Sequence, residues 1–461
     1  MSEVNKSATV DSNEKVKKAH KESVEERLEH LKIQEDSVAR KNRLKVIQAD
    51  QNSHLFSAKS FEQLELKPEL HRGILSMGFE KPSSIQEMAL PLILKEPREN
   101  LIAQAQSGSG KTVAFCLGML SQIDTSKKCT QAMVLTPTRE LAVQCVTQTL
   151  LPMAKYLDPS LTVMLALAGT KIMRGAQIND HIVVGTPGTV EMFLKKRSLN
   201  VNSIKIFILD EADQMLDDSF GGTIQKIKSY IIMPHQSLLF SATFPPSVIE
   251  FAKEIILPPI NEIRLASDEE LVLEEITQLW VDLRSTSLNR TELLKDLYTL
   301  LQMGQSIVFC SSKRSCNDVT KALQEVNFSC SNLHGNLEGY ERDICMEDFR
   351  LGKKKVLITT NVLARGVDIP AVTLVVNYDM PELHYSSTAD FESYLHRIGR
   401  TGRFGRSGVV INLVHNEISY QLLKEIENHF SPSKKMIKPA PTDVEELEEL
   451  VSKVFSGKSS I

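Results

Sequence analysis

Short apolar runs alternate with longer amphipathic stretches from about residue 56 onward. The runs end in Gly, Thr, Ser or Asp, and they read NLIAQAQSG, AMVLTPTRE, LTVMLALAG, HIVVGTPG, IKIFILDEAD and SLLFSATF. Apolar runs of this length are typical of parallel strands buried on both faces, and the stretches between them are long enough for crossover helices. This part of the chain is therefore expected to form a mainly parallel sheet flanked by helices.

A second series of apolar runs follows a polar segment. It reads ITQLWVDL, SIVFCSSK, KVLITTNV, LVVNYDMP and VVINLVHN. The segment 266–274 between the two series is acidic and poor in strand-forming residues, as expected of a linker. The pattern predicts an α/β protein with a first domain at 56–265, a linker at 266–274 and a second domain of similar build at 275–461.

Residues 1–55 have a different composition, rich in Lys, Glu and Ser and poor in aromatic residues. This composition predicts a charged N-terminal extension that is largely disordered. Val24, Leu28 and Leu31 recur at helical spacing and are compatible with one short helix. Two roles stay open for this arm: a plain solvated tail, or a segment that folds into the cleft between the domains and restrains closure.

Bulk composition narrows the class of protein. The 461 residues are 42% apolar and 24% charged, with a formal net charge of -4. These values indicate a soluble globular protein without a chain-wide basic surface, although a local basic groove is compatible with them. The seven scattered cysteines form no C-x-x-C pair, which argues against a zinc site and favours a reducing compartment. No apolar run could span a bilayer, and the N-terminus lacks the apolar core of a signal peptide.

The string AQSGSGKT at 105–112 follows one predicted strand and precedes a helical stretch. Small residues let backbone N–H groups surround phosphates, and the N-terminus of the next helix favours negative charge. Lys111 is expected to reach the β- and γ-phosphates and Thr112 to hold Mg²⁺, although a Gly/Ser-rich turn with an incidental Lys is the alternative. The predicted phosphate contacts are Ser107, Gly108, Ser109, Gly110, Lys111 and Thr112.

The string ILDEADQML crowds Asp210, Glu211 and Asp213 at the end of an apolar run. Like charges so close repel each other, so the cluster is either a solvated turn or the site of a cation. The predicted strand Ile204–Leu209 is expected to run beside the phosphate-loop strand, which would let Asp210 share Mg²⁺ with Thr112. Glu211 is then expected to orient and deprotonate an attacking water, and Asp213 to contact a neighbouring motif.

Several further motifs appear in a fixed order. PTRELA at 137–142, DEAD at 210–213, SAT at 241–243, ARGVD at 364–368 and HRIGRTGR at 396–403 resemble the motifs of the DEAD-box RNA helicases. The resemblance runs from about residue 56 to the C-terminus. It implies two tandem RecA-like domains and an RNA-stimulated hydrolysis of ATP to ADP and phosphate, with ATP and Mg²⁺ as cofactors.

The resemblance also assigns an adenine site. GFEKPSSIQ at 78–86 resembles the family's adenine-reading motif, in which the Gln86 amide would donate to and accept from the base edge. Phe61 would stack on the base. A buried Gln86 that only holds its own loop is the alternative.

The second domain is expected to complete the ATP site. The resemblance implies that Arg400 and Arg403 stabilise charge on the γ-phosphate in the transition state. Gly366 and Asp368 would lie near the ribose and the γ-phosphate. His396 would couple the domains by contacting the first domain; the residues assigned to this coupling are Asp213, Ser241, Thr243 and His396.

RNA contacts are implied at loops that follow strands. Backbone N–H groups, hydroxyls and guanidinium groups suit the sugar-phosphate backbone, so binding should tolerate any sequence and can sense the 2′-hydroxyl. The implied residues are Thr138, Arg139, Gly169, Thr186, Gly188, Arg342 and Thr360.

Departures from the family pattern indicate a subfamily. Thr189 stands where many members have Arg, Asn361 where most have Asp, and Gly339 where a Gln commonly precedes Arg342, while segment 380–400 is longer than in most members. Ala168 replaces the first Gly of a usual pair. With these departures, the chain resembles the DEAD-box ATPases of mRNA export at the nuclear pore. At Thr189 and Gly339, the residues that commonly contact RNA in the family are replaced.

This resemblance implies single-stranded RNA in mRNA–protein complexes as the ligand. It implies two protein partners, a cytoplasmic-side nucleoporin and an export activator that binds inositol hexakisphosphate, and a monomer that works without a membrane at the cytoplasmic face of the nuclear pore. Three alternatives stay open: a DEAD-box helicase of translation initiation or ribosome assembly, a DNA-directed translocase, and a non-catalytic, nucleotide-gated RNA clamp. A comparison of RNA and DNA as stimulators of ATPase activity, and single-turnover hydrolysis, separate the last two from the main interpretation.

Overall fold

The computed structural model describes residues 45–48, 57–105, 108–173, 175–217, 220–264, 276–301, 304–361, 372–383, 386–402, 407–430 and 436–455. The chain divides into two compact units, Met1–Arg43 and Leu44–Ile461, and every described residue lies in the second. The predicted linker 266–274 and most of the predicted extension 1–55 lie outside the described residues. One part of that extension is ordered, because Lys45–Ile47 forms a strand, β1.

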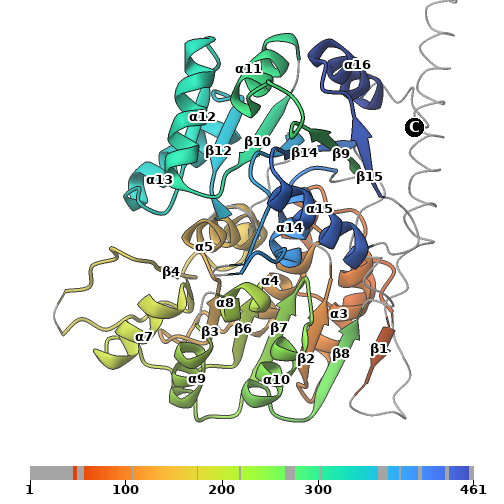
Figure 1. Ribbon diagram of the computed structural model, residues 1–461. Coiled ribbons are helices and arrows are strands. Elements are labelled where there is room, and N and C mark those ends of the chain that lie inside the picture. The colour runs from red at the N-terminus through yellow and green to blue at the C-terminus, as the bar shows by residue number, and fades with distance from the viewer. Residues whose placement is uncertain are drawn as a thin grey trace, which may run out of the picture. The chain divides into compact units, whose positions relative to one another are not determined.

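The first sheet has eight strands in the order β1-β8-β2-β7-β6-β3-β5-β4 (Figure 1). All neighbouring pairs are parallel except β1 with β8. The strands are β2 Asn100–Gln104, β3 Ala132–Leu135, β4 Val163–Ala166, β5 Ile182–Gly185, β6 Ile206–Asp210, β7 Gln236–Ser241 and β8 Ile260–Arg264. With its helices this sheet forms the first lobe.

Helices cover both faces of the first sheet. Within β6, Ile206 and Ile208 pack into one hydrophobic core, and Phe207 and Leu209 pack into the other, because successive strand residues point to opposite faces. This two-sided burial is why β6 reads as an unbroken apolar run. The first core packs against α2 Pro68–Ser76, α3 Ser84–Leu94, α4 Lys111–Gln122 and α5 Arg139–Gln144. It also packs against the short helical segments η1 Phe61–Leu64, η2 Cys145–Leu150, α6 Leu151–Met153 and η3 Ala154–Tyr156. The second packs against α7 Pro187–Lys195, α8 Ala212–Asp217, α9 Gly221–Tyr230 and α10 Pro246–Ile255.

The second sheet has seven strands, all parallel, in the order β11-β12-β10-β13-β14-β9-β15. They are β9 Ile276–Asp282, β10 Gln305–Phe309, β11 Cys330–Leu333, β12 Val356–Thr359, β13 Val372–Asn377, β14 Gly408–Val414 and β15 Ile437–Ala440. One core includes residues of α13 Gly339–Arg350, α14 Phe391–Ile398 and α15 Glu417–Phe430, and the other includes residues of α11 Arg290–Leu300, α12 Lys313–Glu325 and α16 Val444–Phe455. This sheet and its helices form the second lobe.

The two mainly parallel sheets confirm the predicted α/β class, while the exact domain limits stay a prediction. One expectation about strand order is wrong. The strand that ends at Asp210 was expected beside the phosphate-loop strand β2, but β7 lies between β2 and β6. Crossover connections let strands far apart in sequence become neighbours, so sequence order does not reveal this arrangement.

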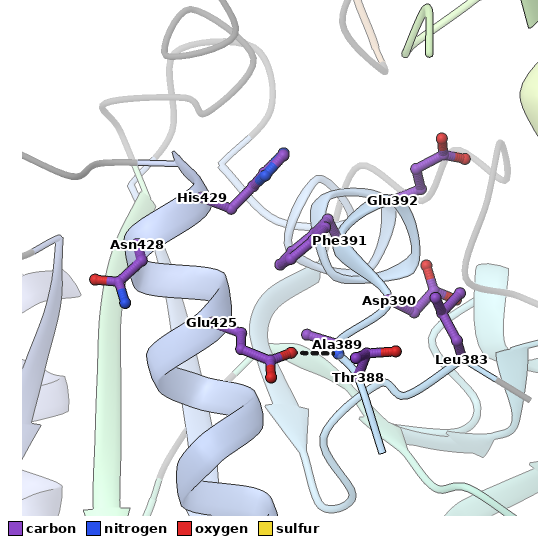
Figure 2. Close-up of a pocket in the computed structure, with 9 residues that line it drawn as sticks. All are labelled: Leu383, Thr388, Ala389, Asp390, Phe391, Glu392, Glu425, Asn428 and His429. Carbon is purple, nitrogen blue, oxygen red and sulfur yellow. Dashed lines mark hydrogen bonds between the residues drawn. The ribbon is translucent and has the colours of Figure 1, made fainter. Parts of the chain in front are cut away.

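The long segment before the arginine motif is anchored against α15. Asp390 caps α14 by accepting a hydrogen bond from the Ser393 amide at 2.8 Å, and Glu425 accepts one from the Ala389 amide at 2.8 Å (Figure 2). The rings of Phe391 and His429 stack 4.0 Å apart beside a cavity of about 540 Å³. This packing orients α14, the helix that carries His396.

Candidate nucleotide and RNA site

The phosphate loop joins the end of β2 to the start of α4. Gly110 caps α4 with a φ of 98°, a left-handed conformation that favours glycine. The buried Lys111 ammonium donates a hydrogen bond to the Ala105 carbonyl at 2.7 Å, and Thr112 is half-buried in the first helical turn. The start of a helix in this position is suited to a phosphate group, because backbone N–H groups point outward there. Ser107, predicted to belong to the loop, lies outside the described residues.

A second motif holds this loop from outside. The Ser83 hydroxyl donates to the Ser109 carbonyl at 2.7 Å, and the Gln86 Nε2 donates to the Gly110 carbonyl at 3.1 Å. The Gln86 Oε1 accepts from the Ser83 amide at 3.0 Å in a capping box at the start of α3. Gln86 is only 2% exposed, and its amide bonds both to the phosphate loop and to its own capping box. Adenine reading by Gln86 stays a prediction.

Phe61 is buried in the first lobe. Its side chain is 1% exposed and belongs to the hydrophobic core that packs around η1 and α3. Stacking of Phe61 on the adenine base stays a prediction.

The acidic cluster is buried, which excludes the solvated turn. Asp210, Glu211 and Asp213 are 4%, 3% and 0% exposed. Asp210 Oδ1 has no hydrogen-bond partner among the described residues, and burial together with the neighbouring Glu211 carboxylate raises the pKa of Asp210 to about 7. A buried carboxylate in this state is suited to a cation, since a positive charge would relieve both effects.

Asp213 links three motifs. Its Oδ2 accepts hydrogen bonds from the Thr243 amide at 3.2 Å and the Thr243 hydroxyl at 2.9 Å, while its backbone amide donates to the Ser241 hydroxyl at 3.2 Å. His396 of the second lobe places Nε2 3.4 Å from Asp213 Oδ2 and Nδ1 3.6 Å from Glu211 Oε2. The structure thus brings together all four residues predicted to couple the domains.

Glu211, Asp213 and His396 also lie close enough to be considered as metal ligands, with their ligand atoms within 4.8 Å of one another. The Asp213 carboxylate is already engaged, because it also accepts from the Gln214 amide at 2.9 Å. The two ring nitrogens of His396 face different carboxylates, and Asp213 Oδ2 already accepts two hydrogen bonds from Thr243. We therefore interpret this trio as a contact between the lobes.

The arginine motif divides into a structural residue and candidate catalytic residues. Arg397 is 1% exposed and donates from Nε and Nη2 to Asn361 Oδ1 at 3.1 and 2.6 Å, and from Nη1 to the Asp379 carbonyl at 2.7 Å. Burial lowers the pKa of the Arg397 guanidinium to about 10. The sequence did not predict this role for Arg397, although it showed Asn361 as a departure from the family.

Arg400 is 2% exposed and donates from Nε to the His396 carbonyl at 2.9 Å. Three predicted residues of the second lobe lie outside the described ranges: Arg403, Gly366 and Asp368.

The predicted RNA residues of the first lobe follow three adjacent strands. Thr138 caps α5 after β3, Thr186 and Gly188 begin α7 after β5, and Gly169 lies in the exposed loop after β4 with a φ of 88°. Since β3, β5 and β4 are parallel neighbours, these loops gather at the carboxyl edge of the sheet, where ligands of open α/β sheets bind. Thr189, which replaces a family arginine, is 8% exposed and does not extend this surface.

The two arginines predicted to bind RNA each contact the opposite lobe. Arg139 pairs with Asp343, and Arg342 pairs with Glu140. The sequence analysis did not predict a role for Glu140 or Asp343. Glu140 directly follows Arg139 in PTRELA, and Asp343 directly follows Arg342 in YERD. In the second lobe, Thr360 follows β12 and is half-buried.

Replacing Gly110 with alanine is expected to disrupt the phosphate loop. The added Cβ would lie 2.3 Å from the Gln86 amide nitrogen, and a left-handed φ costs an alanine about 1–2 kcal/mol. The melting temperature and the ATP affinity should both fall. Gly222→Ala in α9 is the matched control, because its Cβ would meet no atom within 4 Å. An unchanged ATP affinity in Gly110→Ala would contradict the geometry assigned to this loop.

Comparisons with known proteins agree with this arrangement. The chain matches the family model for DEAD/DEAH box helicases over residues 83–251 and the model for the helicase conserved C-terminal domain over 289–405. The ATP-dependent RNA helicase dbp5 of Schizosaccharomyces pombe is 48% identical over 422 residues, which cover 90% of this chain and 81% of that protein. None of the described helices is long and apolar enough to cross a membrane.

Solved structures give the same result. S. cerevisiae Dbp5 bound to RNA and ADP BeF3 matches with a TM-score of 0.81 and 43% identity, covering 86% of this chain and all of that one. A variant of the same protein bound to Nup159, a Gle1 variant, IP6 and ADP matches with a TM-score of 0.60 and 40% identity, covering 85% of this chain and all of that one. The two predicted RecA-like domains are thereby confirmed, and the chain belongs to the DEAD/DEAH box helicase family, among the ATP-dependent RNA helicases.

Proposed function

We propose that this protein is an RNA-stimulated ATPase that clamps RNA and remodels RNA–protein complexes during mRNA export. The observation that carries the proposal is the contact of His396 with Glu211 and Asp213. It joins the acidic residues of the first lobe to the arginine motif of the second. An ATP site divided in this way can be complete only when the lobes meet, which links hydrolysis to any ligand that favours their closure.

The phosphate loop supplies the binding half of the site. Backbone N–H groups of Gly108, Ser109 and Gly110 would cradle the phosphates. Lys111, now bonded to the Ala105 carbonyl, would turn to the β- and γ-phosphates. Thr112 and Asp210 would hold Mg²⁺, partly through water, and this ion would neutralise charge on the phosphate oxygens. The buried Asp210 Oδ1, which has no hydrogen-bond partner in the part of the chain that the structure describes, supports that assignment.

Three side chains are proposed to carry the chemistry. Glu211 orients the attacking water and accepts its proton, because it neighbours the cation ligand Asp210 and is itself buried. Arg400 and Arg403 stabilise the charge that develops on the transferred phosphoryl group. Asp213 is held by Ser241 and Thr243 and contacts His396. This contact positions the arginine motif of the second lobe beside the phosphate site of the first.

RNA is proposed to bind along the loops at the carboxyl edge of the first sheet and to the α13 arginine of the second lobe. The hydroxyls of Thr138 and Thr186, the backbone at Gly169 and Gly188, and the guanidinium groups suit phosphates and 2′-hydroxyls. The second-lobe contacts proposed are Arg342 and Thr360. Such contacts read no bases, so the enzyme should act on single-stranded RNA of any sequence.

The proposed setting is the cytoplasmic face of the nuclear pore, with a nucleoporin and an activator that binds inositol hexakisphosphate as partners of a monomer. Support comes from the relative whose solved structures contain Nup159, Gle1 and IP6. Depletion of the protein should leave polyadenylated RNA inside the nucleus. Normal export combined with failed translation or ribosome assembly would favour the sister DEAD-box functions instead.

ATPase activity with and without RNA tests the enzymatic proposal. We expect single-stranded RNA, and not DNA of the same sequence, to stimulate phosphate release. Lys111→Ala should lower this rate about 10²–10³-fold, because a cation directed at the phosphates is lost. Lys253→Ala, an exposed lysine of α10, is the matched control. Equal stimulation by DNA would favour a DNA translocase, and absent single-turnover hydrolysis would favour a non-catalytic clamp.

A further inference from the structure

Two salt bridges cross between helix α5 of the first lobe and helix α13 of the second. The Arg139 guanidinium donates from Nε to Asp343 Oδ1 at 3.1 Å and from Nη2 to Asp343 Oδ2 at 2.6 Å. In the opposite direction, Arg342 donates from Nη2 to Glu140 Oε2 at 2.7 Å, and its Nε lies 2.7 Å from Glu140 Oε1. Each helix thus contributes one arginine and one carboxylate from adjacent positions. We call this arrangement the crossed pair.

Gly339 makes room for one half of the crossed pair. A Cβ at this position would lie 3.1 Å from the Arg139 guanidinium carbon and 3.1 Å from its Nη1. A side chain here would require the Arg139 guanidinium to shift by a few tenths of an ångström. The glycine that stands here, where a Gln commonly precedes Arg342, lets the guanidinium lie this close.

The crossed pair leaves part of each arginine available. A guanidinium has five N–H donors, and both arginines direct their Nε and Nη2 edge at a carboxylate. No hydrogen bond joins the Nη1 group of either arginine to another residue in the described part of the chain. Arg139 is 23% exposed and Arg342 16% exposed at the side chain. Each guanidinium is oriented by the opposite lobe and still presents donors for a phosphate oxygen.

We propose that Asp343 and Glu140 are positioning residues that orient the RNA-binding arginines across the lobes. The inference rests on the proposed function, because it takes Arg139 and Arg342 as phosphate contacts. The carboxylates reach these arginines across the lobes in the arrangement seen here, so lobe closure would itself prepare the arginines for RNA. If the carboxylates instead competed with phosphate for the arginines, removing them would strengthen RNA binding.

The test is the affinity for a labelled ten-nucleotide oligouridine in the presence of ADP and beryllium fluoride. Asp343→Asn should weaken RNA binding about twofold to fivefold, as expected for loss of a half-exposed ion pair. Glu140→Gln should weaken it more, since the Glu140 side chain is only 3% exposed. Gly339→Ala should act in the same direction as Asp343→Asn, because it displaces the Arg139 guanidinium. Asp348→Asn is the matched control, because this α13 carboxylate pairs with Lys353 inside its own lobe at 3.0 Å.

A double-mutant comparison separates positioning from a general charge effect. In an Arg139→Ala background, Asp343→Asn should cause no further loss, because the residue that it orients is gone. Tighter RNA binding by Asp343→Asn alone, or an equal loss with and without Arg139, would overturn the positioning role. RNA stimulation of ATPase in the unmodified chain is measured separately. A chain that is stimulated by RNA but insensitive to Asp343→Asn would refute the positioning role and leave the proposed function intact.

Discussion

Glu211→Gln should stop ATP hydrolysis and leave ATP and RNA bound. Glutamine keeps the size of the side chain but cannot take a proton from water, and loss of a general base costs about 10²–10⁴-fold in rate. Asp210 remains to hold the cation. Single-turnover hydrolysis should therefore fall by this factor, while labelled RNA should dissociate more slowly from the ATP complex than from the unmodified enzyme.

The backbone at Glu211 supports a functional role for this residue. Its φ of 56° lies in the left-handed region, which few residues other than glycine adopt. Such strain persists where surrounding contacts hold it, and it gathers at active sites. Glu250→Gln, at an exposed position of α10, is the control for the charge change and should hydrolyse ATP normally. Loss of ATP binding in Glu211→Gln would show that the residue supports the nucleotide rather than the attacking water.

Arg400→Ala should lower kcat about 10³-fold or more, as the loss of an arginine finger does. Arg400 lies two residues after the end of α14, whose His396 contacts the acidic cluster. The Arg400 Nε donates to the His396 carbonyl at 2.9 Å. The position therefore couples the phosphate site to the second lobe. Steady-state ATPase at saturating RNA measures the effect, and normal hydrolysis there would refute the finger role.

Three further variants test whether the lower kcat of Arg400→Ala comes from loss of the guanidinium or from unfolding of the protein. Arg400→Lys keeps the positive charge but loses the planar guanidinium, so an intermediate rate is expected. Arg314→Ala removes an arginine of α12 that is 93% exposed and should leave the rate unchanged. Arg397→Ala should behave differently, because this buried guanidinium bonds to Asn361 and to the Asp379 carbonyl. Its main effect should be a lower melting temperature.

One expectation about the fold is wrong for a physical reason. The strand that ends at Asp210 was expected beside β2, because neighbours in space were inferred from neighbours in the sequence. The order of strands in a sheet depends on how the crossover helices pack. A motif of about ten residues carries no information on that packing, so the motifs alone do not predict the strand order.

The sequence by itself determined the α/β class, the two strand series and the phosphate loop at 105–112. Strands buried on both faces must be apolar throughout, and a phosphate loop is built from consecutive residues, so both leave local signals. Only the tertiary structure decided which distant groups meet. Asp213 contacts Thr243 and His396, and Gln86 bonds to the Gly110 carbonyl. Arg139 pairs with Asp343, which lies 204 positions away in the sequence. A single polar side chain carries no local trace of its partner, because the packing of whole helices on two sheets brings the pair together.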